Sequence, residues 1–210
     1  MLFLYAMDLK KMIEKGLTAF HIPFDEGILK ELCFYTLELK KWNEHINLVG
    51  LKDVELIVRE LLYDTFFLYG HVRRSKTLLD MGSGAGIVAI PLKILNGKMD
   101  IFSVDKGLKK IQFQRHIKRS MHLKGLTLLQ SRIETLEPIE VDSLAVKGFG
   151  DIKGILEKGG RHVRENGHAF ILKGTKEDPI DYQGFDLKDV IPYRLPMNEK
   201  AYRLFIYKKI

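Results

Sequence analysis

The chain carries Thr77-Leu78-Leu79-Asp80-Met81-Gly82-Ser83-Gly84-Ala85-Gly86, and an apolar run over residues 87–92 follows at once. This pattern predicts a buried parallel strand that ends in an acidic residue, then a glycine-rich turn and the start of a helix. Three glycines at alternate positions remove Cβ atoms where the backbone bends sharply and where a ligand approaches it. The N–H groups that open the helix would then point toward that ligand.

The acidic residues around this turn favour a nucleoside cofactor. The G-x-G-x-G spacing differs from the G-x-G-x-x-G of a dinucleotide site. Asp80 suits a ligand with a positive group, such as S-adenosylmethionine with its ammonium. Asp105 closes the next strand-like run, 25 positions beyond Asp80, which is about the length of one β-α-β unit, and a carboxylate there can bind both ribose hydroxyls. A glycine turn of no special function and a solvated aspartate are the alternatives.

Composition indicates a soluble globular protein. The 210 residues are 46% hydrophobic and 29% charged, which suits one domain with an appendage. The single cysteine, Cys33, excludes a disulfide framework and is expected in the core. The seven histidines show no H-x-x-H or H-E-x-x-H spacing, so no metal site is expected. Residues 1–7 are apolar but too short for a membrane span and lack the basic front of a signal peptide, which predicts a cytoplasmic protein.

The formal charge of +7 favours a polyanionic partner. Basic residues crowd a single predicted helix and its ends: Lys106, Lys109, Lys110, Arg115, Lys118, Arg119, His122 and Lys124. Like charges at i,i+4 with no carboxylate between them destabilise an isolated helix by a few tenths of a kcal/mol. We therefore interpret this basic helix as a surface for an external partner, with a plainly solvated face as the alternative.

Apolar periodicity divides the chain into a helical part and an alternating part. Helix-like spacing covers residues 7–21, 25–45 and 53–69, with Asp25 as an N-cap. Strand-like runs alternate with helices after that. The last two runs leave no room for a helix between them, so they predict an antiparallel hairpin at the sheet edge. The strand-like runs are 77–81, 100–104, 126–130, 142–147, 167–173, 185–193 and 202–208.

This order predicts an α/β fold of the class I S-adenosylmethionine-dependent methyltransferase type. Its Rossmann-like, mostly parallel sheet would end in the C-terminal antiparallel hairpin. We expect an N-terminal helical extension over residues 1–72 and the methyltransferase domain over residues 73–210. Because no exposed apolar repeat stands out, we expect a monomer.

Several separate motifs occur in a fixed order along nearly the whole chain. In order and spacing they resemble the bacterial 16S ribosomal RNA guanine-N7 methyltransferases, also called the glucose-inhibited division protein B family. They are Lys41-Trp42-Asn43, Asn47-Leu48, Asp64-Thr65, Leu79 to Gly86, Ile90-Pro91-Leu92, Val104-Asp105, Lys109-Lys110, Phe113, Gln130-Ser131-Arg132-Ile133-Glu134, Phe149 and Leu172-Lys173-Gly174.

The resemblance implies transfer of a methyl group from S-adenosylmethionine to N7 of one guanine in small-subunit ribosomal RNA. Carried over by position, Gly82 and Ile87 line the cofactor cleft and Asp105 lies near the ribose. Ile133 and Glu134 lie beside the adenine. Together with the glycine turn, the expected cofactor-binding residues are Asp80, Gly82, Ser83, Gly84, Gly86, Ile87, Asp105, Ile133, Glu134 and Lys147.

Four positions depart from the family pattern. Leu61 replaces a histidine, and Lys147 replaces an arginine near the cofactor and entering base, which keeps charge but loses the bidentate fork. Val88-Ala89 replaces a proline-glycine pair, and Tyr202-Arg203 replaces an arginine-histidine pair. These departures keep two alternatives open: a methyltransferase of the same fold that acts on another nucleic-acid base, and a non-catalytic rRNA-binding assembly factor.

The implied chemistry asks for little acid–base catalysis. Guanine N7 bears a lone pair and no proton, so the main task is to hold the reacting atoms in line. No residue is therefore singled out as certainly catalytic. Lys147 and Lys173 follow predicted inner strands, where ligands bind in open α/β sheets, and they are candidate contacts to RNA phosphate or guanine O6. Ordinary strand-end lysines are the alternative, and Trp42 is expected in the core.

Overall fold

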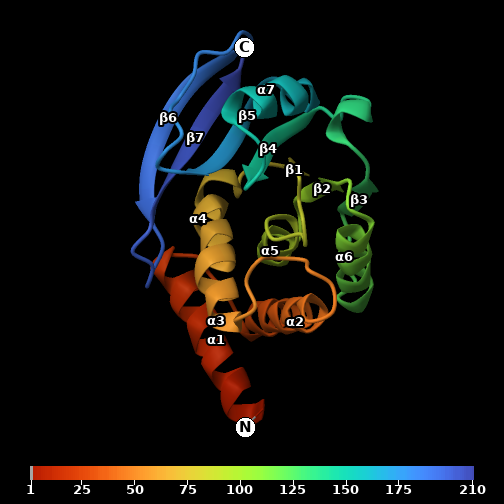
Figure 1. The fold of residues 1–210 in the computed structure, drawn as a ribbon, viewed down its shortest axis with the longest axis vertical. Helices are drawn as coiled ribbons and strands as arrows, with labels where there is room; N and C mark the ends of the chain where they lie inside the picture. The colour runs from red at the N-terminus through yellow and green to blue at the C-terminus, as the bar shows by residue number, and fades with distance from the viewer. Residues whose placement is uncertain (1) are drawn as a thin grey trace.

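The computed structural model describes residues 2–210, with side chains described from Met7 onward. A seven-stranded sheet forms the centre, in the order β3-β2-β1-β4-β5-β7-β6 (Figure 1). The first five strands are parallel, and the last two add to β5 as an antiparallel hairpin. The strands are β1 Thr77–Met81, β2 Asp100–Asp105, β3 Leu126–Gln130, β4 Val141–Lys147, β5 Val163–Gly174, β6 Phe185–Arg194 and β7 Ala201–Lys209.

Hydrophobic side chains cover both faces of this sheet. Successive residues of a strand point to opposite faces, and β1 follows this rule. Leu78 belongs to one core cluster, which also contains residues of the N-terminal helices, and Leu79 belongs to the second, which contains residues of α7. The α-helices are α1 Leu2–Ala19, α2 Glu26–Asn43, α3 Val54–Ile57, α4 Tyr63–Val72, α5 Ala89–Leu95, α6 Leu108–Ser120 and α7 Ile152–Gly159.

The predicted α/β fold, with its mostly parallel sheet and C-terminal antiparallel hairpin, is confirmed. α1 begins at Leu2, earlier than predicted, and the third predicted helix is interrupted. Asp25 caps α2, since its Oδ1 accepts the N–H of Ile28 at 2.8 Å. The single helix expected over residues 53–69 is broken by a π-helical turn, Val58–Leu62, between α3 and α4. Such turns insert an extra residue into the helical ladder and are frequent at functional sites. This one directly precedes the buried residues Asp64 and Thr65.

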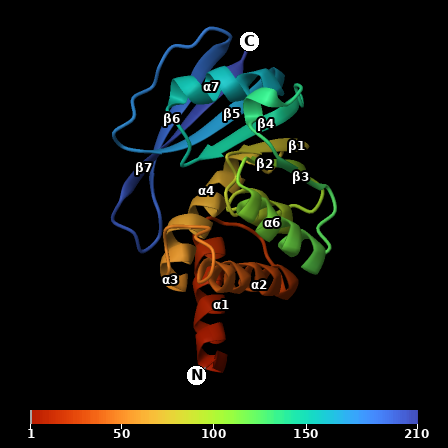
Figure 2. The same cartoon turned by 45° about the vertical axis from the view of Figure 1, so that its right-hand side comes forward.

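The N-terminal helices and the sheet share one core. The cluster around Leu78 includes Leu9 of α1, Tyr35 of α2 and Phe66 of α4, together with Phe113 of α6. Figure 2 shows α1, α2 and α3 grouped at one end of the molecule, next to α6. The helical part is therefore continuous with the methyltransferase part through buried contacts. The boundary between residues 72 and 73 stays a prediction.

Candidate cofactor and RNA site

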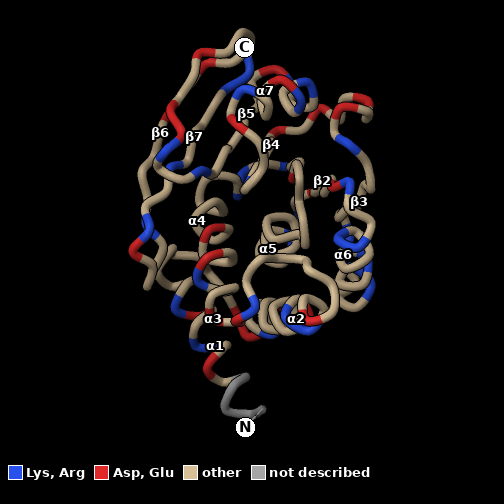
Figure 3. The backbone as a smooth tube through the Cα atoms, viewed as in Figure 1, with Lys and Arg blue, Asp and Glu red and all other residues tan. Residues whose placement is uncertain are grey.

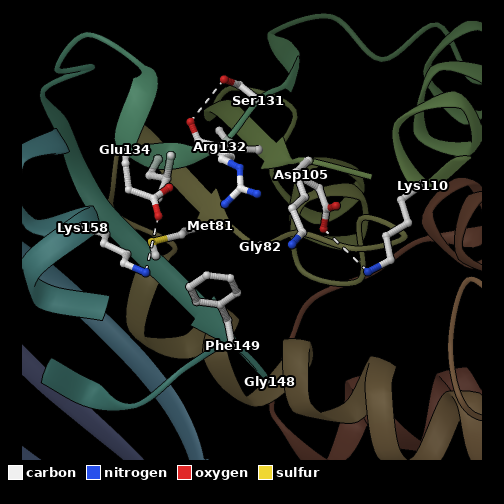
Figure 4. A pocket seen from close by; sticks show the side chains of 13 residues that line it. Met81, Gly82, Asp105, Lys110, Ser131, Arg132, Glu134, Gly148, Phe149 and Lys158 are labelled. Atoms are coloured by element: carbon white, nitrogen blue, oxygen red, sulfur yellow. Dashed lines mark hydrogen bonds and ion pairs between the residues drawn. The ribbon is translucent and has the colours of Figure 1, made fainter. Parts of the chain in front are cut away.

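A cavity of about 330 Å³ opens at the carboxyl edge of the sheet, where β1, β2 and β4 end. Its walls come from segments that are far apart in the sequence, and Lys110 of α6 and Lys158 of α7 complete them (Figure 4). Met81 and Gly82 follow β1, Asp105 ends β2, residues 131–134 follow β3, and residues 148–149 follow β4. Ligands bind at this edge in open α/β sheets, and the volume lies at the lower end of the range for small-molecule sites.

The glycine turn requires its glycines for two different reasons. Gly82, Gly84 and Gly86 all have positive φ, at 72°, 57° and 73°, a region that residues with a Cβ rarely adopt. A Cβ on Gly82 would lie only 2.8 Å from Cδ2 of Phe149, whereas the space beside Gly84 is open. The turn therefore allows the Phe149 ring to rest against the backbone that forms one wall of the cavity.

Asp105 joins this turn to the start of α6. It is 8% exposed, and its Oδ2 accepts the N–H of Gly84 at 2.9 Å while its Oδ1 accepts the N–H of Gly107 at 2.7 Å. Lys110 Nζ lies 3.8 Å from Oδ2. A carboxylate with both oxygens held in this way stays fixed at the cavity wall, where its remaining lone pairs can accept hydrogen bonds from a ligand.

Asp80 lies behind the cavity and does not line it. Its carboxylate is buried, and Oδ2 accepts the N–H of Ala89 at 3.0 Å. The sequence favoured a helix whose first N–H groups point to the ligand, but this N–H points to Asp80 because α5 begins only at Ala89. The pKa of Asp80 is raised to about 7, mainly by burial, while the hydrogen bond from the Ala89 N–H lowers it and the nearby charge of Asp105 adds to the rise.

This raised pKa predicts that stability falls as the pH rises. The folded state keeps a proton on Asp80 between the ordinary pKa and about 7, so the unfolded state binds fewer protons in that window. We expect the free energy of unfolding to fall by about 2 kcal/mol between pH 5 and pH 8 relative to Asp80→Asn, which keeps the acceptor for Ala89. Urea denaturation of both proteins across this range measures it, and a constant difference would contradict the role of burial.

Gln114 fixes the turn from the side of α6, and the sequence analysis missed it. The Nε2 of Gln114 donates to Ser83 Oγ at 2.9 Å and to the Gly84 carbonyl at 2.8 Å. Its Oε1 accepts from Ser103 Oγ at 2.6 Å. The sequence does contain a signal for it: Gln114 lies three positions after Ile111 and three positions before Ile117, so this polar residue shares the apolar face of the predicted helix. Buried side-chain amides need such partners.

The other expected cofactor residues are divided between the cavity and the core. Ile133 and Glu134 line the cavity, and Glu134 forms an ion pair with Lys158 at 3.4 Å. Ser83 and Gly86 are buried within the glycine turn. Ile87 packs in the first core cluster, and its carbonyl accepts from Thr65 Oγ1 at 2.9 Å. The cavity also contains Arg132 and Phe149, which were part of the family motifs but had been given no role.

Lys147 anchors the end of β4, Lys173 braces the loop that follows it, and neither enters the cavity. Lys147 Nζ donates to the carboxylate of Asp64, and the other oxygen of Asp64 accepts from the Tyr193 hydroxyl. Lys173 Nζ donates to the carbonyls of Phe149 at 3.1 Å and of Gly150. Lys173 thus positions the loop that carries Phe149, which forms part of the cavity wall.

The structure places three of the four departures from the family pattern, all except Lys147, in core packing or in local contacts of β7. Leu61 packs against the first core, and Val88 and Ala89 belong to it. Tyr202 stacks on Tyr193 with ring centroids 5.5 Å apart. Arg203 donates to the Glu177 carbonyl at 3.0 Å.

No helix within residues 2–210 has both the length and the apolar character that a bilayer crossing requires. Among the side chains from Met7 onward, no group of three or more His, Cys, Asp or Glu residues is placed to hold a metal ion.

Comparison with known proteins identifies the family. The model of the GidB family, described as rRNA small subunit methyltransferase G, matches residues 28–184. The Ribosomal RNA small subunit methyltransferase G of Geobacter sp. (strain M21) is 31% identical over 208 residues, which cover 94% of this chain and 96% of the relative.

Solved structures show the same fold at low sequence identity. A SAM-dependent methyltransferase from Aquifex aeolicus has a TM-score of 0.56 at 16% identity and covers 71% of this chain and 92% of its own. The 1,6-didemethyltoxoflavin-N1-methyltransferase of Burkholderia thailandensis, solved with S-adenosylhomocysteine, has a TM-score of 0.58 at 14% identity, with coverage of 89% and 92%. The chain belongs to the rRNA small subunit methyltransferase G family.

Proposed function

We propose that this protein transfers a methyl group from S-adenosylmethionine to N7 of a guanine in 16S ribosomal RNA. The observation that carries the proposal is the cavity at the carboxyl edge, with Asp105 fixed on one wall and Ile133 on the other. Family membership supports the cofactor and the ribosomal substrate. The assignment of N7 as the methylated atom rests on the resemblance of the motifs and on the reactivity of N7, which carries a lone pair and no proton.

The residues of the cavity fit the proposed cofactor. Asp105 offers carboxylate oxygens to ribose hydroxyls, and Ile133 offers an apolar surface to the adenine ring. Phe149 rests against Gly82 and closes the side next to β4. When bound there, S-adenosylmethionine supplies an activated methyl group on a cationic sulfur. We place Gly82, Gly84, Asp105, Ile133 and Glu134 around it.

The remaining expected residues do not line the cavity but hold the segments that form its wall. Asp80 holds the start of α5 through Ala89, and Ser83 and Gly86 are buried residues of the turn itself. Ile87 anchors the turn in the core. We therefore assign Asp80, Ser83, Gly86, Ile87 and Lys147 positioning roles in the cofactor site.

The proposed reaction suits a site without a general base. Because N7 carries a lone pair and no proton, no residue has to remove a proton from the guanine. The protein has to bring N7 into line with the methyl group and exclude competing orientations. Lys173 serves this task by holding the carbonyls of Phe149 and Gly150, and Lys147 by anchoring the end of β4 to Asp64. We therefore propose no catalytic acid–base pair.

The test is methyl transfer with labelled S-adenosylmethionine to small ribosomal subunits from a strain that lacks this protein. We expect label in N7-methylguanine at a single site after nucleoside analysis, since the family acts on small-subunit rRNA. A different methylated nucleoside would favour action on another base. Bound cofactor and RNA without any transfer would favour a non-catalytic assembly factor, to which the departures at Leu61 and Lys147 point.

We also propose that the protein acts as a monomer in the cytoplasm, where its ribosomal substrate is assembled. The large apolar side chains that are exposed come from different elements, such as Phe34 of α2, Leu108 of α6 and Leu187 of β6. Stable homodimers need a contiguous apolar patch. The molar mass in solution, measured by light scattering, tests the monomer.

A further inference from the structure

A second hollow lies at the opposite edge of the sheet from the cofactor cavity. Helix α6 begins just after β2 ends and leads to the start of β3, so its C-terminal end lies at the amino edge of the parallel strands. The hollow has a volume of about 930 Å³. We call it the α6 groove; its lining includes Trp42, Arg115, Lys118, Arg119, His122 and Lys124.

The cations of the α6 groove have no acidic partners among the described side chains. Among the side chains described from Met7 onward, Arg115, Lys118, Arg119 and Lys124 take part in no salt bridge that meets a 4.0 Å limit. Figure 3 shows the blue of lysine and arginine along α6. Glu38 of the facing helix α2 is engaged elsewhere, since its carboxylate lies 2.5 Å from His116 Nε2 and 3.9 Å from Lys41 Nζ.

Stabilisation of the helix explains only part of this charge. Lys118 and Arg119 occupy the last turn of α6, where positive charge interacts favourably with the helix dipole. Arg115 precedes that turn, and Lys124 follows the helix by four residues. Repulsion between Arg115 and Arg119 at i,i+4 works against the helix. Stabilisation of α6 therefore does not account for Arg115 and Lys124.

An aromatic floor accompanies the charge. Trp42, from the end of α2, lies over His116 with ring centroids 5.0 Å apart and packs edge-on against Phe113. The expected core role of Trp42 thus holds for one side of its ring, while the half-buried side chain also lines the groove. Cations next to an accessible aromatic ring are typical of sites that hold an RNA backbone and stack a base.

An exposed stripe connects the groove to the cofactor edge. Lys109, Gln112, Arg115 and Arg119 recur every three or four positions on α6, and all four are exposed. Lys110, at the start of α6, lines the cofactor cavity. From Lys110 to Arg119 the helix rises by about 14 Å, which is longer than a single nucleotide and favours a polynucleotide chain over a small anion.

We infer that the α6 groove is a second RNA-binding site, which holds the phosphate backbone of the ribosomal RNA outside the nucleotide that is modified. This inference rests on the proposed function for the identity of the RNA. The groove contacts phosphates without reading sequence, and it adds affinity and orientation to the contact at the cofactor cavity.

The test combines a charge-neutralised variant with a matched control. The variant is Arg115→Gln, Lys118→Gln and Arg119→Gln, since glutamine keeps high helix propensity. The control is Lys11→Gln, Lys15→Gln and Lys30→Gln, which removes the same charge from exposed positions on α1 and α2. The probe is in vitro transcribed small-subunit rRNA, and its binding is measured over a range of salt concentrations.

We expect the groove variant to bind the RNA about tenfold more weakly and with a salt slope reduced by about 2, because about three phosphate contacts are lost. The control should keep most of the affinity and the slope. Trp42 is the only tryptophan in the chain, so its fluorescence reports on the groove directly. RNA should quench it in the wild type and the control. An unchanged emission at saturating RNA, or equal slopes in both variants, would overturn the inference.

Two further measurements separate this inference from the proposed function. The affinity for S-adenosylmethionine should be the same in the groove variant and the wild type, because the groove lies at the other edge of the sheet. If RNA quenches Trp42 in the wild-type protein but no methyl group is transferred, the proposed reaction alone is contradicted. If the wild-type protein methylates RNA without any change in Trp42 emission, only the proposed RNA-binding role of the α6 groove is contradicted.

Discussion

Replacing Asp105 with alanine is expected to weaken the binding of S-adenosylmethionine by about two orders of magnitude. The substitution removes the acceptor of two backbone N–H groups, those of Gly84 and Gly107. It also removes the proposed acceptor of the ribose hydroxyls. A hydrogen bond to a charged group contributes about 1.5–3 kcal/mol, so the loss of one ribose contact and of the fixed turn together gives about 3 kcal/mol, or about 100-fold in Kd.

Isothermal titration calorimetry with S-adenosylmethionine measures this change. Asp105→Asn keeps an acceptor oxygen for one of the two N–H groups and should lose less affinity than Asp105→Ala. Asp8→Ala removes a carboxylate from an exposed position on α1 and should bind normally. Unchanged affinity in Asp105→Ala would exclude this residue from the cofactor site.

Replacing Asp64 with alanine is expected to lower the free energy of unfolding by about 2 to 3 kcal/mol. Asp64 is 2% exposed and is the acceptor for both Lys147 and Tyr193. Its removal leaves a largely buried ammonium group without its carboxylate, which typically costs about 3–5 kcal/mol. The Lys147 side chain is 21% exposed, and this access to water reduces the expected loss.

Urea denaturation of a small set of variants separates the charge from the hydrogen bond. Tyr193→Phe removes one hydrogen bond, and we expect a smaller loss of about 1 kcal/mol. Combining Asp64→Ala with Lys147→Met removes both charges, so the pair should recover part of the stability. If Asp64→Ala were as stable as the wild type, the contact between Asp64 and Lys147 would be absent in solution.

The strands could be predicted from local pattern because each is a short apolar run with clear ends. β1 and β3 match their predicted bounds, and β4 begins one residue earlier than expected. β5 begins four residues earlier, at Val163, because Val163 pairs with Val141 of β4. A bulge that contains Asn166, with its positive φ of 62°, separates this pair from the regular pairing that starts at His168. The π-helical turn before Tyr63 was missed, since its apolar spacing is that of an ordinary helix.

The site could be predicted less completely, because its contacts are not local. Asp105 and Ile133 follow strands, so their position at the cavity follows from the order of the sheet. The side chains around Asp64 are 83 and 129 residues away from it in the chain, and no periodicity relates them. Asp80 shows a different difficulty: its sequence position is the same whether the carboxylate faces a ligand or the N–H of Ala89.

The N-terminal helices hold the backbone of the glycine turn directly. The Tyr35 hydroxyl donates to the carbonyl of Ala85 at 3.2 Å, and Thr65 Oγ1 donates to the carbonyl of Ile87 at 2.9 Å. Both pairs are buried, so unpartnered carbonyls there would be costly. The helical extension is consequently not an exchangeable module. A chimera that joined residues 73–210 to the leading segment of an unrelated methyltransferase would need a tyrosine and a threonine at these two places to keep its cofactor turn in shape.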